Sequence, residues 1–267
     1  DIRFDGKYTR NLHPVRGVGS TAGTQYFLSN RNFDVTNDTI FVMQINGALD
    51  EPATELKIGM GKTSPNYGVP PNGRQADTDL SDPTKGLQTN DGRVLGAITN
   101  GEWIQFVSNT VNPQTGFSAV YHGIIDQPGT AEQSIKGSIL GDNILDLGYP
   151  NIAFAGNEAC DFETIIGVNF TSPTDFPGVG AFYFGNDSSY SDFIRIKEGD
   201  SIVDKHSDSY ERWGDYFGIQ PRYNRPGEVW ISGFYGLQDT RSGTWINQLN
   251  SPDSAAIMAT VSESGDA

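Results

Sequence analysis

The residues of this chain best suited to chemistry stand side by side in one segment, Arg212-Trp213-Gly214-Asp215-Tyr216. An arginine and a carboxylate can hold polar groups, and a neighbouring tryptophan offers a flat apolar face on which a sugar ring can stack. A carboxylate can also take part in glycoside hydrolysis. The segment therefore predicts a ligand-binding mouth or an active site, and the third interpretation is a structural role.

Hydrolysis of a glycosidic bond requires two carboxylates about 5–9 Å apart. Asp215 and Asp91 are the candidates, because both stand just before a predicted strand, although sequence spacing leaves their separation open. Other hydrolytic chemistry has little support, since the chain contains neither a Gly-x-Ser-x-Gly elbow nor a His-Glu-x-x-His motif. His122 lies within the apolar run AVYHGII, where a packed strand histidine is expected. These observations favour a binding protein over an enzyme.

Metal binding rests on two oxygen-rich loops. Cys160 is the single cysteine, which excludes a multi-cysteine metal site, and its apolar surroundings predict a buried thiol. The loops GNDSSYSD (185–192) and ADTDLSD (76–82) offer oxygen ligands that suit calcium, but neither has the spacing of an EF-hand. Asn and Asp in such loops commonly bond to their own backbone instead. The calcium candidates are Asp187, Asp192, Asp77 and Asp79, and no other cofactor is expected.

The charge of the chain limits its partners. With 18 Lys+Arg against 33 Asp+Glu the formal net charge is −15. Such a chain repels phosphate backbones and anionic membrane surfaces, so nucleic-acid and lipid-surface binding are not expected. The apolar runs are far shorter than the ~20 residues of a membrane helix, so membrane insertion is not expected either.

The elements that must position the candidate residues follow a repeat. Four apolar runs begin after turn residues, and each is followed by a second run that opens on an acidic residue. The acidic residues recur at intervals of about 60 residues, which indicates a repeated unit. They are Asp38, Glu102, Glu163 and Glu228. The runs are short, rich in β-branched and aromatic residues and bounded by Gly, Asn, Asp and Pro, which predicts strands.

A unit of four antiparallel strands repeated along the chain is typical of β-propeller blades. We therefore predict an all-β chain with four four-stranded blades, which form part of a larger propeller. A β-sandwich is the rival architecture, and the regular repeat argues against it. The loop 64–86 is predicted to be a surface excursion. The predicted divisions are 1–20, an outer strand of a preceding or closing blade; 21–90, a blade with this long loop; 91–148, 149–212 and 213–262, three further blades; and 263–267, the start of a polar linker.

In a propeller, the residues just before the first strand of each blade face the entrance of the central channel. Polar groups that converge there can hold a polar ligand, a sugar or a cation. They can equally hydrogen-bond neighbouring blades, as buried polar groups must. Gly214 is expected to permit a close approach of the backbone. The predicted ligand-binding residues are Arg93, Asn151, Arg212, Trp213 and Asp215.

The segments RWGDYFGIQ, LQTNDGRVLGAI, VPPNGRQ and YFLSNRNFDVTNDTIFVMQI together resemble an uncharacterised family of secreted β-propeller proteins from bacteria of the Bacteroidota type. The wider sialidase-like propellers are more distantly similar. The resemblance covers roughly residues 20–250, implies secretion or a place on the cell surface, and implies no particular activity. Sialidases carry repeated S-x-D-x-G-x-T-W motifs, and the segment 238–245 keeps only the final Thr244-Trp245. This departure argues against a sialidase.

These observations predict a secreted or cell-surface β-propeller that acts as a binding or adhesion module. Its partner is expected to be a glycan, a surface protein or another part of the same propeller. Two alternatives stay open: a carbohydrate-active hydrolase with carboxylates at the channel mouth, and a structural subunit of an extracellular assembly.

Overall fold

The computed structural model describes residues 2–19, 23–48, 50–205, 210–215 and 217–252. Strands make up 52% of it and these ranges contain no α-helix, which confirms the predicted all-β class. None of the described residues belongs to a helix that is long and apolar enough to span a membrane. Tyr216, residues 253–262 at the end of the last predicted blade, and the predicted linker 263–267 lie outside the described residues.

Four antiparallel sheets succeed one another along the chain, and strands form at the first, second and third positions predicted for each repeat. The first sheet contains β5 (Thr24–Asn30), β6 (Asn37–Asn46) and β7 (Glu55–Tyr67). The second contains β9 (Val94–Thr99), β10 (Trp103–Val111), β11 (Ser118–Asp126) and β12 (Ser134–Leu140). The third contains β13 (Asp146–Phe154), β14 (Thr164–Thr171), β15 (Gly178–Phe184) and β16 (Ile194–Lys197). The fourth contains β18 (Gly218–Pro221), β19 (Glu228–Gly236) and β20 (Ser242–Asn250).

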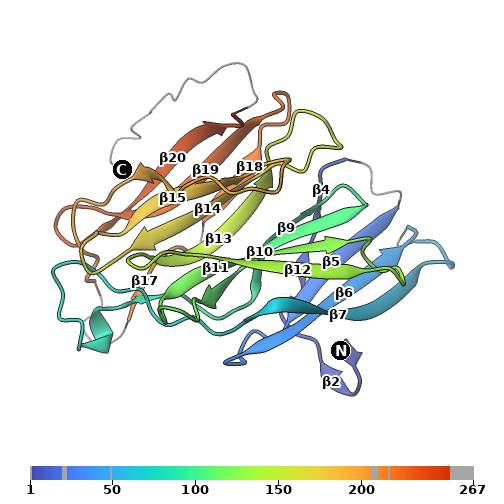
Figure 1. Cartoon of the computed structure of the whole chain (residues 1–267), viewed down its shortest axis with the longest axis horizontal. Coiled ribbons are helices and arrows are strands. Elements are labelled where there is room, and N and C mark those ends of the chain that lie inside the picture. The colour runs from blue at the N-terminus through green and yellow to red at the C-terminus, as the bar shows by residue number, and fades with distance from the viewer. Residues whose placement is uncertain (1, 20–22, 49, 206–209, 216, 253–267) are drawn as a thin grey trace.

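The first strands of the four sheets are neighbours in space. β5 contacts β9, β9 contacts β13 and β13 contacts β18. Farther out, β7 packs on β12, and β15 packs on β19. In Figure 1 the sheets follow one another from blue (β5–β7) through green (β9–β12) and yellow (β13–β15) to red (β18–β20). The first strands, which begin at or near the candidate residues, therefore converge on one region.

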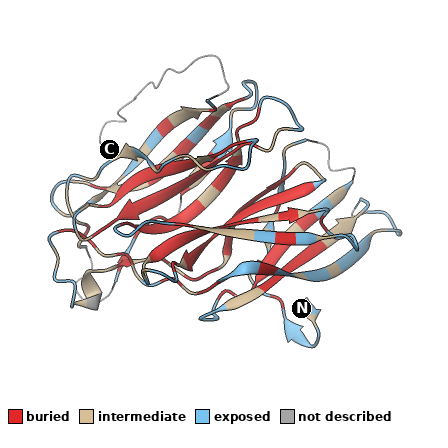
Figure 2. Ribbon diagram, in the orientation of Figure 1, coloured by how far each residue is buried: buried red, intermediate tan, exposed pale blue. Residues whose placement is uncertain are grey.

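The central sheets are buried on both faces. All 8 residues of β14 are buried, as are all residues of β10 except Val111. Their sequences are accordingly near-continuous apolar and small-polar runs, without the alternation of a strand that has one face in water. The outer strands β7 and β20 carry many more exposed residues, and Figure 2 shows them in pale blue and tan against the red centre.

The N-terminal segment lies along the inner edges of the first two sheets. Arg16 extends from there to the other two, because its guanidinium donates hydrogen bonds to the carbonyls of Ile219 in β18 (3.0 Å) and of Ile152 in β13. Residues 13–17 therefore contact all four first strands, whereas an outer strand was predicted for residues 1–20. The strands of this region are β1 (Arg3–Phe4) and β2 (Lys7–Tyr8), which form a hairpin, β3 (His13–Pro14), which pairs with β5, and β4 (Arg16–Gly17), which runs parallel to β9.

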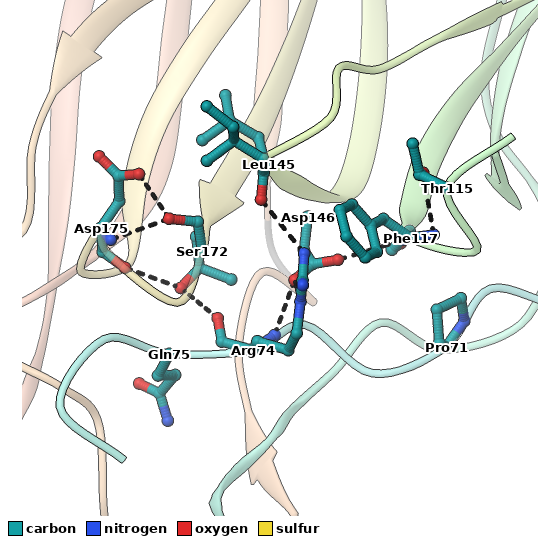
Figure 3. Close-up of polar contacts among 12 residues, drawn as sticks. Pro71, Arg74, Gln75, Thr115, Phe117, Leu145, Asp146, Ser172 and Asp175 are labelled. Atoms are coloured by element: carbon teal, nitrogen blue, oxygen red, sulfur yellow. Dashed lines mark hydrogen bonds and ion pairs between the residues drawn. The ribbon is translucent and has the colours of Figure 1, made fainter. Parts of the chain in front are cut away.

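The long loop after β7 is docked on the molecule, and its prediction as a surface excursion is wrong for residues 68–76. The Nε and the backbone amide of Arg74 both donate to Oδ2 of Asp146, at 2.7 and 3.0 Å (Figure 3). The guanidinium also lies 3.5 Å from the centre of the Phe117 ring. Gln75 bonds to both the amide and the carbonyl of Val203, at 2.8 and 3.0 Å. These contacts hold the loop against elements far along the chain.

Candidate functional site

A short parallel strand pairing positions the Arg-Trp-Gly-Asp segment. β17 (Glu211–Arg212) pairs with β8 (Leu87–Gln88), which follows the docked loop and its 3-10 turn (Pro83–Lys85). Leu87 and Glu211 are buried at this pairing, and the Trp213 that follows is only 1% exposed. The side chain of Arg212 lies at the surface. The docked loop therefore determines where residues 211–215 lie.

Asp215 connects Arg212 to a tyrosine of the third sheet. The Nε and Nη2 atoms of Arg212 donate to Oδ2 of Asp215 at 3.0 and 2.8 Å. The side chain of Tyr149 is hydrogen-bonded to the same carboxylate. Burial raises the pKa of Tyr149, and the negative charge of Asp215 raises it further. The phenol therefore keeps its proton at neutral pH and acts as a hydrogen-bond donor to Asp215.

The backbone of Tyr149 has an unusual conformation. Its φ is 54°, in the left-handed region that bulky residues rarely adopt, and it lies in an irregularity of β13 between Gly148 and Asn151. The amide of Tyr149 donates to Oδ1 of Asn109 at 2.9 Å, which helps to hold this conformation. Such backbone strain persists only where the surrounding structure enforces it, and it is found most often at binding and active sites.

Gly214 allows the segment to approach the third sheet closely, as the sequence predicted. Its φ is +74°, and a Cβ atom at this position would lie 2.3 Å from Nδ2 of Asn169 and 2.6 Å from a ring carbon of Tyr149. No side chain larger than hydrogen fits there without displacing the amide or the ring.

Arg93 and Asp91 form a second ion pair beside the first. The Nε of Arg93 donates to Oδ1 of Asp91 at 2.8 Å, and its Nη2 bonds to the other carboxylate oxygen. The hydrogen bond to Asp91 raises the pKa of Arg93, and the negative charge of Asp215 contributes to the rise. Arg93 is therefore within electrostatic reach of the Asp215 group. The structure thus brings together four of the five predicted binding residues, namely Arg93, Arg212, Trp213 and Asp215, with Asp91 beside them.

A cavity of about 440 Å³ adjoins this cluster. Trp213 contributes the indole, which makes an edge-on contact with the Phe234 ring at a centroid distance of 6.3 Å. Among the described residues the indole Nε1 has no hydrogen-bond partner, and neither has Nδ2 of Asn169, which lies against Gly214. Buried donors in folded proteins are almost always bonded, so these two atoms are exceptions next to the cavity. The cavity lining consists of Arg212, Trp213, Gly214, Asp215, Phe217, Gly233, Phe234, Ser242 and Thr244.

Asn151, the fifth predicted binding residue, does not line this cavity. Its Oδ1 accepts from the amide of Ile152 at 2.9 Å and from Nη2 of Arg16 at 3.5 Å, and its Nδ2 donates to the carbonyl of Phe217 at 3.3 Å. Asn151 therefore joins β13 to the start of the fourth sheet. This is the structural role that the sequence offered as the alternative to ligand binding.

The calcium candidates occupy local turns. Oδ1 of Asp187 accepts from the amide and the hydroxyl of Ser189 at 3.0 and 2.7 Å, and Asp79 makes the same pair of bonds to Ser81 at 2.9 and 2.7 Å. These bonds lower the pKa of both carboxylates. In the described ranges, no three His, Cys, Asp or Glu side chains gather to hold a metal ion, and Asp77 and Asp192 belong to no such group.

Two further predictions concern single residues. His122 is buried, as expected of a packed strand histidine, and its ring nitrogens bond to the hydroxyl of Tyr190 (2.8 Å) and to Oε1 of Gln105 (3.1 Å). Cys160 is exposed, so the predicted buried thiol is wrong. Its neighbours are polar turn residues, and the amides of Asn157 and Glu158 fold back onto the carboxylate of Asp161.

Sequence reasoning missed Tyr149 and Asn169. Alignment of the repeats assigned Asn151 to the mouth, but the irregularity in β13 shifts the register and places Tyr149 beside Asp215 instead. The Gly-Tyr-Pro sequence at 148–150 is the only local sign of this bend. Asn169 lies within a fully buried strand, and no pattern in the sequence distinguishes it from a structural asparagine.

Comparison with known proteins adds no relative: no protein-family model matches the chain, and no curated protein is similar to it in sequence. The family resemblance noted in the sequence therefore stays a prediction.

Proposed function

We propose that the four sheets are blades of a larger β-propeller, and that the protein is secreted or displayed on the cell surface, where it binds a glycan. Two features support the propeller. Within each sheet the strands that follow the first lie farther out in chain order, and consecutive first strands contact one another. Among the described residues β18 makes no extensive contact with β5, which favours a ring that needs further blades to close. The resemblance to secreted Bacteroidota propellers supports the location.

The cavity beside Trp213 is the observation that carries the choice of ligand. It combines three aromatic residues with the charged and hydroxyl groups of Arg212, Asp215, Ser242 and Thr244. Sugars present apolar ring faces and many hydroxyls, so they match both components. At about 440 Å³ the cavity has room for one or two sugar residues.

Binding is favoured over hydrolysis by the state of the two candidate carboxylates. Both oxygens of Asp91 bond to Arg93, and the Asp91 side chain is buried behind this contact. Oδ2 of Asp215 bonds to Arg212. A glycosidase requires one carboxyl that delivers a proton to the glycosidic oxygen and a second that faces water or the anomeric carbon. Neither aspartate is free to take the first role without breaking its arginine pair.

A glycan-array screen followed by calorimetry with the retained glycans tests this proposal. The Asp215→Asn variant should lose affinity by about tenfold or more, because a charge-assisted contact and the position of Arg212 change together. The matched control is Asp192→Asn, the same substitution at an exposed turn of the third sheet. Equal affinity of wild type and Asp215→Asn would contradict the proposal. Turnover of a glycan that disappears in both Asp215→Asn and Asp91→Asn would establish a hydrolase in its place.

A further inference from the structure

A second cavity lies at the opposite end of the first strands. Its volume is about 570 Å³. The Trp213 cavity adjoins the residues that precede β18, whereas this one is reached from Ile98, Phe154 and Gln220, near the ends of β9, β13 and β18. Its walls are completed by β4, by the loop 156–159 and by the turn that joins β18 to β19. The two cavities share no lining residue.

Arg16 contributes a cation without a carboxylate partner. Its guanidinium donates to the carbonyls of Ile219 and Ile152, which are neutral, and among the described residues it forms no ion pair. A guanidinium carries five N–H groups, so donors remain for a ligand. Arginine matches a carboxylate in geometry as well as in charge.

The cavity holds two arginines although the chain as a whole is acidic. Its charged lining residues are Arg16, Arg222 and Glu158, in a chain whose formal net charge is −15. Arg222 is paired with Glu228 at 2.7 Å, which leaves Arg16 as the unneutralised cation of this set. An anionic group therefore finds its best-matched position at Arg16.

Tyr223 supplies an aromatic surface at the same cavity. Its side chain is 99% exposed, an unusual state for a large aromatic residue, and it belongs to the lining together with Phe154 and Pro221. The amides of Asn157 and Gln220 add donors and acceptors. An exposed aromatic ring with planar polar side chains beside it suits the ring face and hydroxyls of a sugar.

We propose that this cavity binds a hexuronic acid residue of an acidic glycan, with the sugar carboxylate at Arg16 and the sugar ring at Tyr223. The inference does not depend on the Trp213 cavity, because the two sites are separate.

Cys160 provides the reporter for the test, since it is the single cysteine of the chain, is exposed and follows the lining residue Ala159. The protein labelled there with an environment-sensitive fluorophore is titrated with digalacturonate, with its methyl ester and with free galacturonate. The acid disaccharide should give a saturable response, and the ester should bind about tenfold more weakly because it lacks the charge. Free galacturonate should bind through the same residues.

Variants test whether the fluorescence response arises from binding at this cavity. Tyr223→Ala should weaken digalacturonate binding about tenfold without a change in Tm, because the side chain is fully exposed. Arg16→Gln should remove the preference for the acid over the ester, even where the variant is less stable. Phe33→Ala, which changes an exposed aromatic in a turn of the first sheet, should bind as wild type. No saturable response, equal affinity for acid and ester, or an affinity unchanged in Tyr223→Ala would each overturn the proposal.

Discussion

The hydroxyl of Tyr149, at the irregularity of β13, is hydrogen-bonded to the carboxylate of Asp215, which precedes β18. This bond joins the third sheet to the fourth at the edge of the candidate site. Arg212 and Tyr149 both donate to the carboxylate of Asp215. Asp215 therefore fixes the position of a charged donor, Arg212, relative to a neutral donor, Tyr149. The predictions below concern this bond and the elements that support it.

Tyr149→Phe removes the hydroxyl and keeps the ring. We expect affinity for the bound glycan to fall by about tenfold, because Asp215 loses one of the two partners that orient it. Calorimetry measures the change, and Tyr8→Phe, at an exposed position that lines neither cavity, is the matched control. Unchanged affinity in Tyr149→Phe would show that the bond does not organise the site.

Gly214→Ala tests the close approach of the Arg-Trp-Gly-Asp segment to the third sheet. We expect a loss of about 3 kcal/mol in the free energy of unfolding, from the positive φ together with the contacts to Asn169 and Tyr149. Gly116 has the same φ of +74° but nothing within 4 Å of its Cβ position. Gly116→Ala should therefore lose only about 1 kcal/mol. Urea denaturation measures the free energy of unfolding of both variants. Equal losses would show that the contacts of the Gly214 position with Asn169 and Tyr149 do not restrict it.

Asp146→Ala tests whether the docked loop is held by its buried ion pair. Asp146 is 1% exposed and accepts two bonds from Arg74, so we expect a loss of about 3 kcal/mol when the arginine is left without this partner. We also expect faster proteolysis within residues 76–82. Glu55→Ala removes an exposed carboxylate 3.2 Å from Lys57 and serves as the control, with no measurable change. Equal protease resistance of wild type and Asp146→Ala would contradict this account of the loop.

Acid should destabilise the protein through His122. Burial lowers the pKa of His122 from 6.5 to about 3, so the folded chain holds this ring neutral while the unfolded chain protonates it. Stability from this residue is complete above pH 6.5 and falls as the pH drops toward 3, by about 1.4 kcal/mol per pH unit. Urea titrations between pH 7 and 4.5 measure the slope, and His122→Gln should flatten it by that amount. An equally steep slope in His122→Gln would refute the assignment of this pH dependence to His122. The pKa of His13 is also lowered, to about 4, and His13 contributes to the slope in the same direction in wild type and variant.

Local patterns were sufficient for the strands and insufficient for the contacts between distant segments. The apolar runs of β6, β10, β14 and β19 begin where their acidic residues predicted, because each run is long enough to fill a buried strand. The docking of the loop 68–76 was not predictable, since Arg74 and Asp146 are 72 residues apart and the sequence around neither residue indicates its partner.

The candidate site was predicted in part for the same reason. Arg212, Trp213 and Asp215 are adjacent in sequence and could be recognised as a group. Tyr149 depends on a shift of register in β13, which changes the residue that faces Asp215. A one-position or two-position shift within a strand leaves its composition unchanged, so the sequence pattern does not reveal it.

The indole N–H resonance of Trp213 tests the central claim most directly. The chain has four tryptophans, so ¹⁵N-indole labelling gives four signals, and Trp213→Phe assigns the relevant one. Titration with a glycan retained on the array should move the Trp213 signal, because Trp213 lines the cavity, and the shift should saturate at the affinity measured by calorimetry. The signal of Trp245, whose Nε1 is also buried and unpartnered but lies outside the cavity lining, should not move. Saturable glycan binding that leaves the Trp213 signal in place would contradict the proposed site.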